Sequence, residues 1–259
     1  MNNVKVYLDD MVEKYNTKSF INQDPILFPR LFSERKDIEI VSFLASTIAW
    51  GNRKQILKDC EKMFFDIMDK KPYDYIMAGD YSNVPINYNI HRTFFGKDFV
   101  YMCNGLKHVY DYYESLEEMF ENTSVWNGFS NIKKVFLSSN GNMETRHISN
   151  PYNSSCKRLN MMLRWLCRQD GIVDIGIWKN IDPSSLMIPV DVHVFRIGTE
   201  LGLIKRKTND RKTVEELTSN LGVFCTNDPC KYDFALFGIG ESRKRKTKKE
   251  LKLNGTIID

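Results

Sequence analysis

Residues 188–198 have the sequence IPVDVHVFRIG, in which an aspartate follows proline and valine at the start of a predicted helix. Asp191 is placed to cap this helix, because an N-cap aspartate accepts hydrogen bonds from the first free backbone N–H groups. Val194, Ile197 and Leu201 recur at the helical period and predict the face that packs inward. A capping aspartate contributes about 1 kcal/mol to stability, so capping alone accounts for Asp191.

A second segment, residues 150–168, has the sequence NPYNSSCKRLNMMLRWLCR and predicts a helix from Ser155 to Arg168. Its apolar residues share one face of the helical wheel: Leu159, Met162, Leu163, Leu166 and Cys167. Lys157, Arg164 and Arg168 fall within about 40° of one another on the opposite side. Lys157 lies in the first turn, where the helix dipole favours anions, and this mismatch is a hint of function.

Apolar residues recur at the helical period along almost the whole chain, and no segment alternates as a strand does. Asp37 is expected to cap a helix that runs to Trp50, with Gly51 as its stop, and Asn52 to cap the next helix. Further helices are predicted at residues 99–113, 126–137, 210–223 and 228–238, the last with Asp228 as its cap. The sequence therefore predicts an all-α fold, with one domain over residues 1–242 and a basic tail over 243–259.

Composition narrows the class of protein. Hydrophobic residues make up 42% of the 259 positions and charged residues 27%, which is typical of a folded rather than a disordered chain. No apolar run approaches the ~20 residues that a membrane-spanning helix needs, and the N-terminal residues lack the pattern of a secretory signal. We therefore expect a cytoplasmic protein that has no membrane partner.

The six cysteines are scattered, and no two of them form a CxxC pair. Zinc sites and iron–sulfur clusters usually require such tight spacings, so neither is expected. Cys225 and Cys230 are close enough in sequence to meet, but in a cytosolic chain we expect them to be reduced thiols. No metal and no other cofactor is predicted.

The net charge of +4 is unevenly distributed. One basic cluster runs from Arg243 to Lys249, and a second comprises residues 205–207 together with Arg211 and Lys212. Such clusters favour a polyanion partner, of which nucleic acid is the commonest. For the C-terminal cluster, a solvated terminus that improves solubility is an equally good interpretation.

Taken together, residues 150–168 and 188–198 resemble the helix-hairpin-helix DNA glycosylases, which include endonuclease III and the adenine and 8-oxoguanine glycosylases. The PVDVHVFRI run is the most specific match and resembles the bifunctional 8-oxoguanine branch. The recognisable motifs cover roughly residues 145–200, and the whole chain also resembles a bacterial family known only as a domain of unknown function. The resemblance implies two helical lobes with a cleft between them, with the central helices at roughly 37–140.

The resemblance also implies roles for individual residues. Lys157 would be the nucleophile and Asp191 its carboxylate partner, 34 positions further along the chain. The usual Leu-Pro-Gly-x-Gly turn of the hairpin is here Asn150-Pro151-Tyr152-Asn153-Ser154-Ser155. The residues expected to bind DNA phosphate groups, with either backbone or side chain, are Asn153, Ser154, Ser155, Arg158, Arg164 and His193. His193 is equally well interpreted as a surface residue of its helix.

The turn formed by Trp50, Gly51, Asn52 and Arg53 lies where the glycosylases insert a wedge into the duplex, so Asn52 and Arg53 are further candidates for DNA contact. Trp50 is either that wedge or, more commonly for tryptophan, a core aromatic residue. Phe195, Trp165 and Trp178 are the candidate rings for stacking on a base. The implied partner is double-stranded DNA, bound by a monomer.

The implied activity is excision of a damaged base followed by cleavage of the strand, and the resemblance to the 8-oxoguanine branch favours an oxidised purine. The main alternative is a nucleic-acid-binding protein that kept the fold without the chemistry. A hydrolase acting on a small substrate lacks support, because no Ser-His-Asp order, phosphate loop or HExxH motif is present. A helical interaction protein with a basic tail is the third alternative, and it would need no reactive lysine.

Overall fold

The computed structural model describes the backbone of residues 2–253 and the side chains of residues 3–243. Within this range the chain is mostly helical, which confirms the all-α prediction, apart from one small two-stranded sheet. The α-helices are α1 (Asn2–Tyr15), α2 (Lys18–Ile21), α3 (Arg35–Thr47), α4 (Arg53–Glu61), α5 (Pro72–Ala78), α6 (Gly96–Tyr112), α7 (Val125–Ser138), α8 (Lys157–Cys167), α9 (Val192–Glu200), α10 (Arg211–Gly222) and α11 (Asp233–Leu253).

Short 3-10 and π turns join several of these helices. They are η1 (Pro25–Leu27), η2 (Pro29–Leu31), the π turn η3 (Lys62–Ile67), η4 (Leu116–Phe120), η5 (Pro183–Ser185) and η6 (Pro229–Tyr232).

Capping residues set the starts of several helices. Asn52 caps α4 by accepting bonds from Lys54 N and Gln55 N, and Asp191 caps α9, as the sequence predicts. The predicted cap at Asp37 is wrong, because α3 begins two residues earlier and the Asp37 carboxylate instead accepts a bond from Tyr73 N at 2.8 Å.

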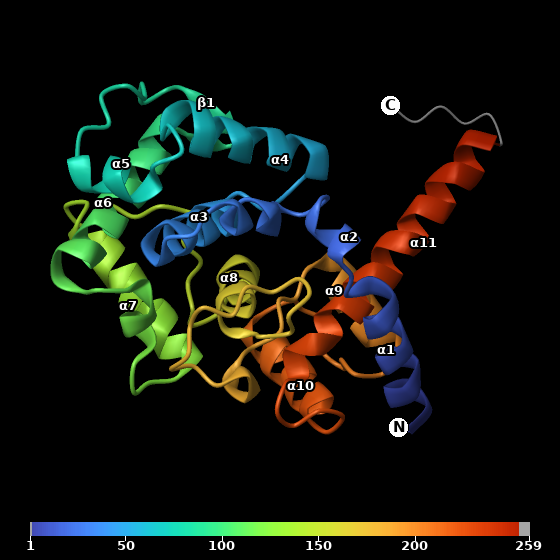
Figure 1. Ribbon diagram of the computed structural model, residues 1–259. Helices are drawn as coiled ribbons and strands as arrows, with labels where there is room; N and C mark the ends of the chain where they lie inside the picture. The colour runs from blue at the N-terminus through green and yellow to red at the C-terminus, as the bar shows by residue number, and fades with distance from the viewer. Residues whose placement is uncertain (1, 254–259) are drawn as a thin grey trace.

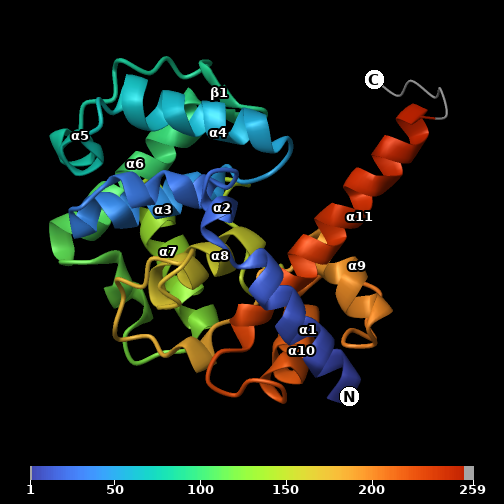
Figure 2. The ribbon, with the colours of Figure 1, turned by 45° about the vertical axis from the view of Figure 1, so that its right-hand side comes forward.

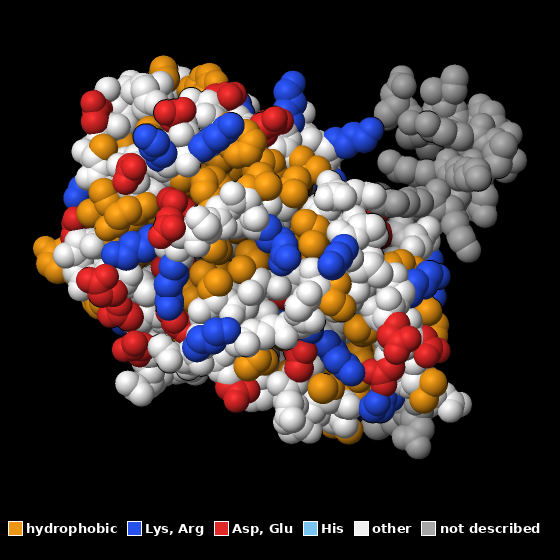
Figure 3. Space-filling view, viewed as in Figure 1, with side chains coloured by type: hydrophobic (Ala, Val, Ile, Leu, Met, Phe, Trp, Pro, Cys, Tyr) orange, Lys and Arg blue, Asp and Glu red, His pale blue; other side chains and the backbone are white. Residues whose placement is uncertain are grey.

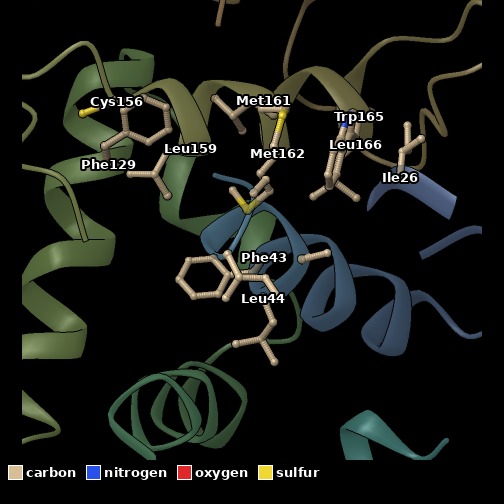
Figure 4. Packing of buried hydrophobic residues seen from close by; sticks show 14 of the residues in the cluster. Ile26, Phe43, Leu44, Phe129, Cys156, Leu159, Met161, Met162, Trp165 and Leu166 are labelled. Carbon is tan, nitrogen blue, oxygen red and sulfur yellow. The ribbon is translucent and has the colours of Figure 1, made fainter. Parts of the chain in front are cut away.

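The centre of the molecule is the contact between α3 and α8. Residues 38–47 of α3 are buried on every side, and so are residues 159–167 of α8. Met162 of α8 points toward α3, whereas Leu44 of α3 points away from α8 (Figure 4), and all three of Met162, Phe43 and Leu44 are buried. Residues 159–167 of α8 therefore have no solvent-facing side, and Arg164 within this range is buried with them.

The other helices pack around this central pair in two groups. On one side of α3, α5 packs against α6 and α6 against α7. On the other side, α11 packs against both α1 and α9, so segments from the two ends of the chain lie side by side (Figures 1 and 2). Tyr15 Oη lies 2.8 Å from Ser242 Oγ, and Tyr232 Oη donates to Asp9 at 3.0 Å.

The small sheet was not predicted. Strand β1 (Asn89–His91) pairs antiparallel with β2 (Phe94–Phe95), with Asn89 opposite Phe95 and His91 opposite Phe94. The two-residue turn between them, Arg92-Thr93, lacks the Asn-Gly or Gly-rich signature by which such hairpins are usually predicted.

The C-terminal helix differs from the prediction for residues 228–238. The 3-10 turn η6 occupies the predicted start, and α11 then continues to Leu253, so helix extends into the predicted basic tail. The side chains of the basic tail from residue 244 onward are not among those that the structure describes. None of the helices within residues 2–253 combines the length and apolar character needed to cross a membrane.

Candidate active site

A cavity of about 780 Å³ lies beside the start of α8. Its walls come from η1, the α3–α4 turn, the turn before α8, and from α8, α9 and α11. Lys157 and Asp191 both line it, so the structure brings together the two residues that the motifs single out. Ligand pockets commonly measure roughly 300–1,000 Å³, so the cavity has room for a small organic group such as a nucleoside.

Lys157 is the first residue of α8 and is half-buried in this cavity. The preceding Cys156 has a left-handed backbone (φ 45°), which turns the chain sharply into the helix. The Lys157 ammonium donates to the carbonyl of Ala49 at 3.2 Å. Burial lowers the pKa of Lys157, although the negative charges of Asp191, Asp24 and Asp233 act in the opposite direction. A lysine with a lowered pKa has a larger neutral, nucleophilic fraction near neutral pH.

Asp191 combines a structural and an electrostatic role. Its Oδ1 accepts bonds from His193 N at 2.8 Å and Val194 N at 2.9 Å, which fixes the side chain at the start of α9. Both bonds end on Oδ1, and among the described residues Oδ2 has no hydrogen-bond donor. The Asp191 carboxylate therefore has one oxygen left to stabilise a positive charge in the cavity.

Three further carboxylates that sequence reasoning missed line the cavity, Asp24, Asp233 and Glu241. Asp24 is buried and caps η1 through a 3.2 Å bond from Ile26 N, and burial raises its pKa against the nearby charge of Arg53. Asp233 opens α11 and is ion-paired with Arg164. Burial, reinforced by the charge of Asp191, raises the pKa of Asp233 to about 6.

Arg164 lines the cavity, and its contact with DNA stays a prediction. Its side chain is buried, where it pairs with Asp233 and also with Asp174 at 3.2 Å. Arg168 is buried in the same way, paired with Asp174 and with Asp228 at 2.8 Å. The helical wheel placed these arginines opposite the apolar face, but distant carboxylates cover that side of α8 as well.

The α3–α4 turn forms one rim of the cavity, and Trp50 is its most constrained residue. The half-buried indole stacks on the His147 ring at 5.6 Å and meets the edge of His91 at 4.8 Å. The guanidinium of Arg158 lies 5.1 Å from the same indole, a cation–π geometry. Trp50 is therefore both packed and exposed to the cavity.

A family model described as a protein of unknown function (DUF2400) matches residues 24–242. The chain belongs to this family. Membership in a family of unknown function is thereby confirmed as predicted from the sequence, while the resemblance to the glycosylases stays a prediction. No curated protein and no solved structure matches the chain. The DUF2400 match spans Lys157, Asp191 and the additional cavity carboxylates Asp24, Asp233 and Glu241.

Other predicted contacts of the DUF2400 chain divide between the cavity and the outside. Asn52, Arg53, Arg158 and His193 line the cavity. Ser154 and Ser155 also line it, whereas Asn153 is exposed and lies outside its lining. His193 is half-buried, and its ring meets that of Phe237 at 5.9 Å.

Of the predicted aromatic residues, Trp50 lines the cavity and Trp165, Phe195 and Trp178 do not. Trp165 is fully buried in the core, which corrects its assignment to a base pocket. Phe195 is half-buried outside the cavity lining, and Trp178 is buried, with its indole N–H donating to Glu39 at 2.8 Å. Besides Trp50, the rings that do line the cavity are Phe20, Phe234 and Phe237.

The turn before α8 is held by its own polar side chains. Asn150 accepts bonds from Tyr152 N and Ser154 N, and Ser154 Oγ accepts one from Cys156 N. Ser154 also forms an isolated bridge with Asp210. No helix occurs within residues 139–156, so α7 and α8 are separated by a long irregular segment. Among the described residues, no group of three or more His, Cys, Asp or Glu side chains is arranged to hold a metal ion.

Proposed function

We propose that this protein is a DNA glycosylase with lyase activity, which excises a damaged base through a Schiff base on Lys157. The observation that supports this most directly is the shared cavity. Lys157 and Asp191 face it from different helices, and burial lowers the pKa of the amine. With the resemblance of residues 150–168 and 188–198 to the glycosylases, this arrangement favours nucleophilic attack on a sugar.

In the proposed reaction the target nucleotide leaves the base stack and enters the cavity. The neutral Lys157 amine attacks C1′ of the sugar, and the glycosidic bond breaks with its electron pair leaving on the base, which takes up a proton. Asp191 stabilises the positive charge that develops on the sugar. The C1′–O4′ bond then breaks and O4′ takes up a proton, while the nitrogen loses its remaining proton, which leaves an imine between C1′ and Lys157.

Strand cleavage follows from the imine. Removal of a C2′ proton allows the C3′–oxygen bond to break, so that the 3′ phosphate departs by β-elimination. Water then hydrolyses the imine and frees Lys157. An oxidised purine is the base class that the resemblance favours.

The remaining cavity residues fit a bound nucleotide. Asn52, Arg53 and Arg158 would contact the backbone at the rim, together with Ser154 and Ser155 from the turn before α8. Among the described residues, Arg53 and Arg158 have no acidic partner within ion-pair distance, so their charges are available to phosphate.

Borohydride trapping tests this proposal. The protein would be incubated with duplexes that contain 8-oxoguanine, an abasic site or no lesion, then reduced and resolved on a denaturing gel. We expect a covalent complex on lesion DNA that is lost in Lys157→Gln. Lys58→Gln is the matched control, because Lys58 is exposed on α4 outside the cavity lining.

The available arginines at the rim also favour a second function, binding of nucleic acid without chemistry. DNA binding with no trapped complex on any duplex would support that alternative and exclude the Schiff base. A protein that neither binds nor is trapped would refute both.

A further inference from the structure

The β1–β2 turn is an unusually well-braced loop. Arg92 at its tip has a left-handed backbone (φ 49°), a conformation that arginine adopts infrequently. The Arg92 carbonyl accepts a bond from Asn89 Nδ2 at 2.7 Å. The next carbonyl, of Thr93, accepts bonds from Arg146 and from His147 Nε2, both at 3.2 Å. The turn is thus held by its backbone, and the Arg92 side chain is left free.

This turn is attached to the rim of the cavity. His91 is buried beneath it and donates from Nε2 to the carbonyl of Trp50 at 2.8 Å. The Arg92 guanidinium lies over Gly51, where a Cβ would come 2.5 Å from Nη1. Gly51 itself lines the cavity and has a positive φ of 99°. The sheet therefore presents Arg92 beside the mouth of the cavity.

The charge around Trp50 is uncompensated. Arg92, Arg146 and Arg158 surround this residue and its loop, and none of the three has an acidic partner within ion-pair distance among the described residues. Asp59 is bound to His91, and Asp98 accepts a bond from Phe95 N and lies 3.6 Å from His147 Nε2.

Several arginines elsewhere among the described residues are paired with acidic side chains. Arg206 and Arg211 each pair with an acidic residue four positions along the chain. On the face seen in Figure 3, basic and acidic side chains are likewise interspersed. Arg92 and Arg146 are both exposed and have no such ion pair among the described residues, so their charges are available to an external anion.

We propose that the β1–β2 turn is a second nucleic-acid contact, in which Arg92 and Arg146 bind backbone phosphate groups beside the cavity. This inference rests on the proposed function only in taking nucleic acid as the partner. Arginine suits the role because its planar fork binds phosphate through two parallel hydrogen bonds. The turn and the segment before α8 would then hold the backbone on two sides of the Trp50 loop.

The salt dependence of binding tests the inference with a short undamaged duplex. The plot of log affinity against log salt concentration has a negative slope, and each lost phosphate contact reduces the steepness of this slope by about 0.9. We expect this decrease for Arg92→Asn, since asparagine tolerates the left-handed backbone. Arg92→Lys should keep the slope, because it keeps the charge. Arg92→Asn combined with Arg146→Gln should lower the slope by about twice as much.

Lys134→Gln is the matched control, since Lys134 is exposed on α7 and outside the cavity lining. It removes the same unit of charge and should leave the slope unchanged. An unchanged slope in both the single Arg92→Asn and the double variant would overturn the inference. Arg92→Asn decides the matter if the double variant unfolds more easily, because among the described residues the Arg92 side chain makes no hydrogen bond.

Failure here is distinguishable from failure of the proposed chemistry. A lowered slope without any borohydride-trapped complex would leave the phosphate contacts in place and exclude the glycosylase reaction. A trapped complex with an unchanged slope would exclude the contacts alone. Absence of any duplex binding would refute both.

Discussion

Nδ1 of His91 lies 2.6 Å from Oδ2 of Asp59, in a buried contact that joins β1 to α4 across 32 positions of sequence. The other ring nitrogen faces the Trp50 carbonyl, which can only accept, so Nε2 carries a hydrogen. The short contact at Nδ1 then requires one more proton between the ring and the carboxylate. The pair holds the Trp50 loop in place while staying neutral overall.

Removal of the His91 imidazole should therefore lower the free energy of unfolding by more than the loss of its packing contacts alone. His91→Phe keeps an aromatic ring but leaves the buried Asp59 carboxylate with only its hydrogen bond from Gln55 Nε2. We expect the free energy of unfolding to fall by about 3–5 kcal/mol, measured by urea denaturation. His108→Phe, at a half-buried position of α6, should change it by less than about 1 kcal/mol. Equal stability of His91→Phe and the wild type would contradict this account.

The pH dependence of Schiff-base formation should follow Lys157. Because burial lowers the pKa of this amine below its ordinary value of 10.5, the trapping rate should rise with pH well before an exposed lysine loses its proton. Asp191→Asn removes a charge that raises the Lys157 pKa, so the rise should move to lower pH even if the maximal rate falls. Single-turnover trapping across pH, with the exposed Asp182→Asn as control, measures both midpoints; identical midpoints in Asp191→Asn and wild type would refute the coupling.

Asp233 should make stability depend on pH in a direction unusual for an aspartate. Burial raises its pKa in the folded protein to about 6 from 3.8, so between those values the folded state holds a proton that the unfolded state has lost. The free energy of unfolding should then decrease as pH rises from about 4 to about 6, by about 3 kcal/mol in total from this group. Asp233→Asn should lack this decrease.

Asp210 provides the opposite case. The bond from Arg206 lowers its pKa, so its contribution to stability is lost as pH falls. Urea unfolding between pH 4 and 7 should therefore give differences from wild type of opposite sign for Asp233→Asn and Asp210→Asn. The same sign in both variants would show that burial does not dominate at Asp233.

Two glycines of helices should respond in opposite ways to alanine. A Cβ added at Gly128 of α7 would collide with the Phe120 ring. Gly128→Ala should therefore destabilise the protein by about 1–3 kcal/mol through overpacking. Gly222 of α10 has nothing within 4 Å of its Cβ position. Gly222→Ala should stabilise the protein by up to about 1 kcal/mol, and thermal unfolding would compare the two. Stabilisation by both would mean that the Phe120 ring moves away at no cost.

Local rules predicted the parts of the fold and site that depend on neighbouring residues. Asn52 and Asp191 are caps because each side chain reaches backbone N–H groups two or three positions ahead. The co-location of Lys157 and Asp191 came from two motifs rather than from periodicity. Asp37 shows the limit, because its carboxylate bonds a distant N–H at Tyr73 instead of capping its own helix.

What the sequence did not predict depends on contacts between distant segments. Arg164 is polar and lies opposite the apolar stripe, and only the folded chain brings Asp174 and Asp233 to it. Asp24 and Asp233 look like ordinary caps in the sequence, with no local sign that they line a cavity. The small sheet escaped prediction because its turn contains Arg92 and Thr93 instead of glycine or asparagine.

The pairing of α1 with α11 has a consequence for the order in which the protein is made. Phe20 and Asp24 are synthesised early and Phe234 and Phe237 late, yet the cavity needs all four. On the ribosome, the apolar side of α1 must wait for α11, although Lys157 and Asp191 have already emerged. Such long-range closure makes folding slow and leaves a nascent chain that exposes apolar surface, so α1 is the segment that a chaperone would shield until synthesis reaches the final helix.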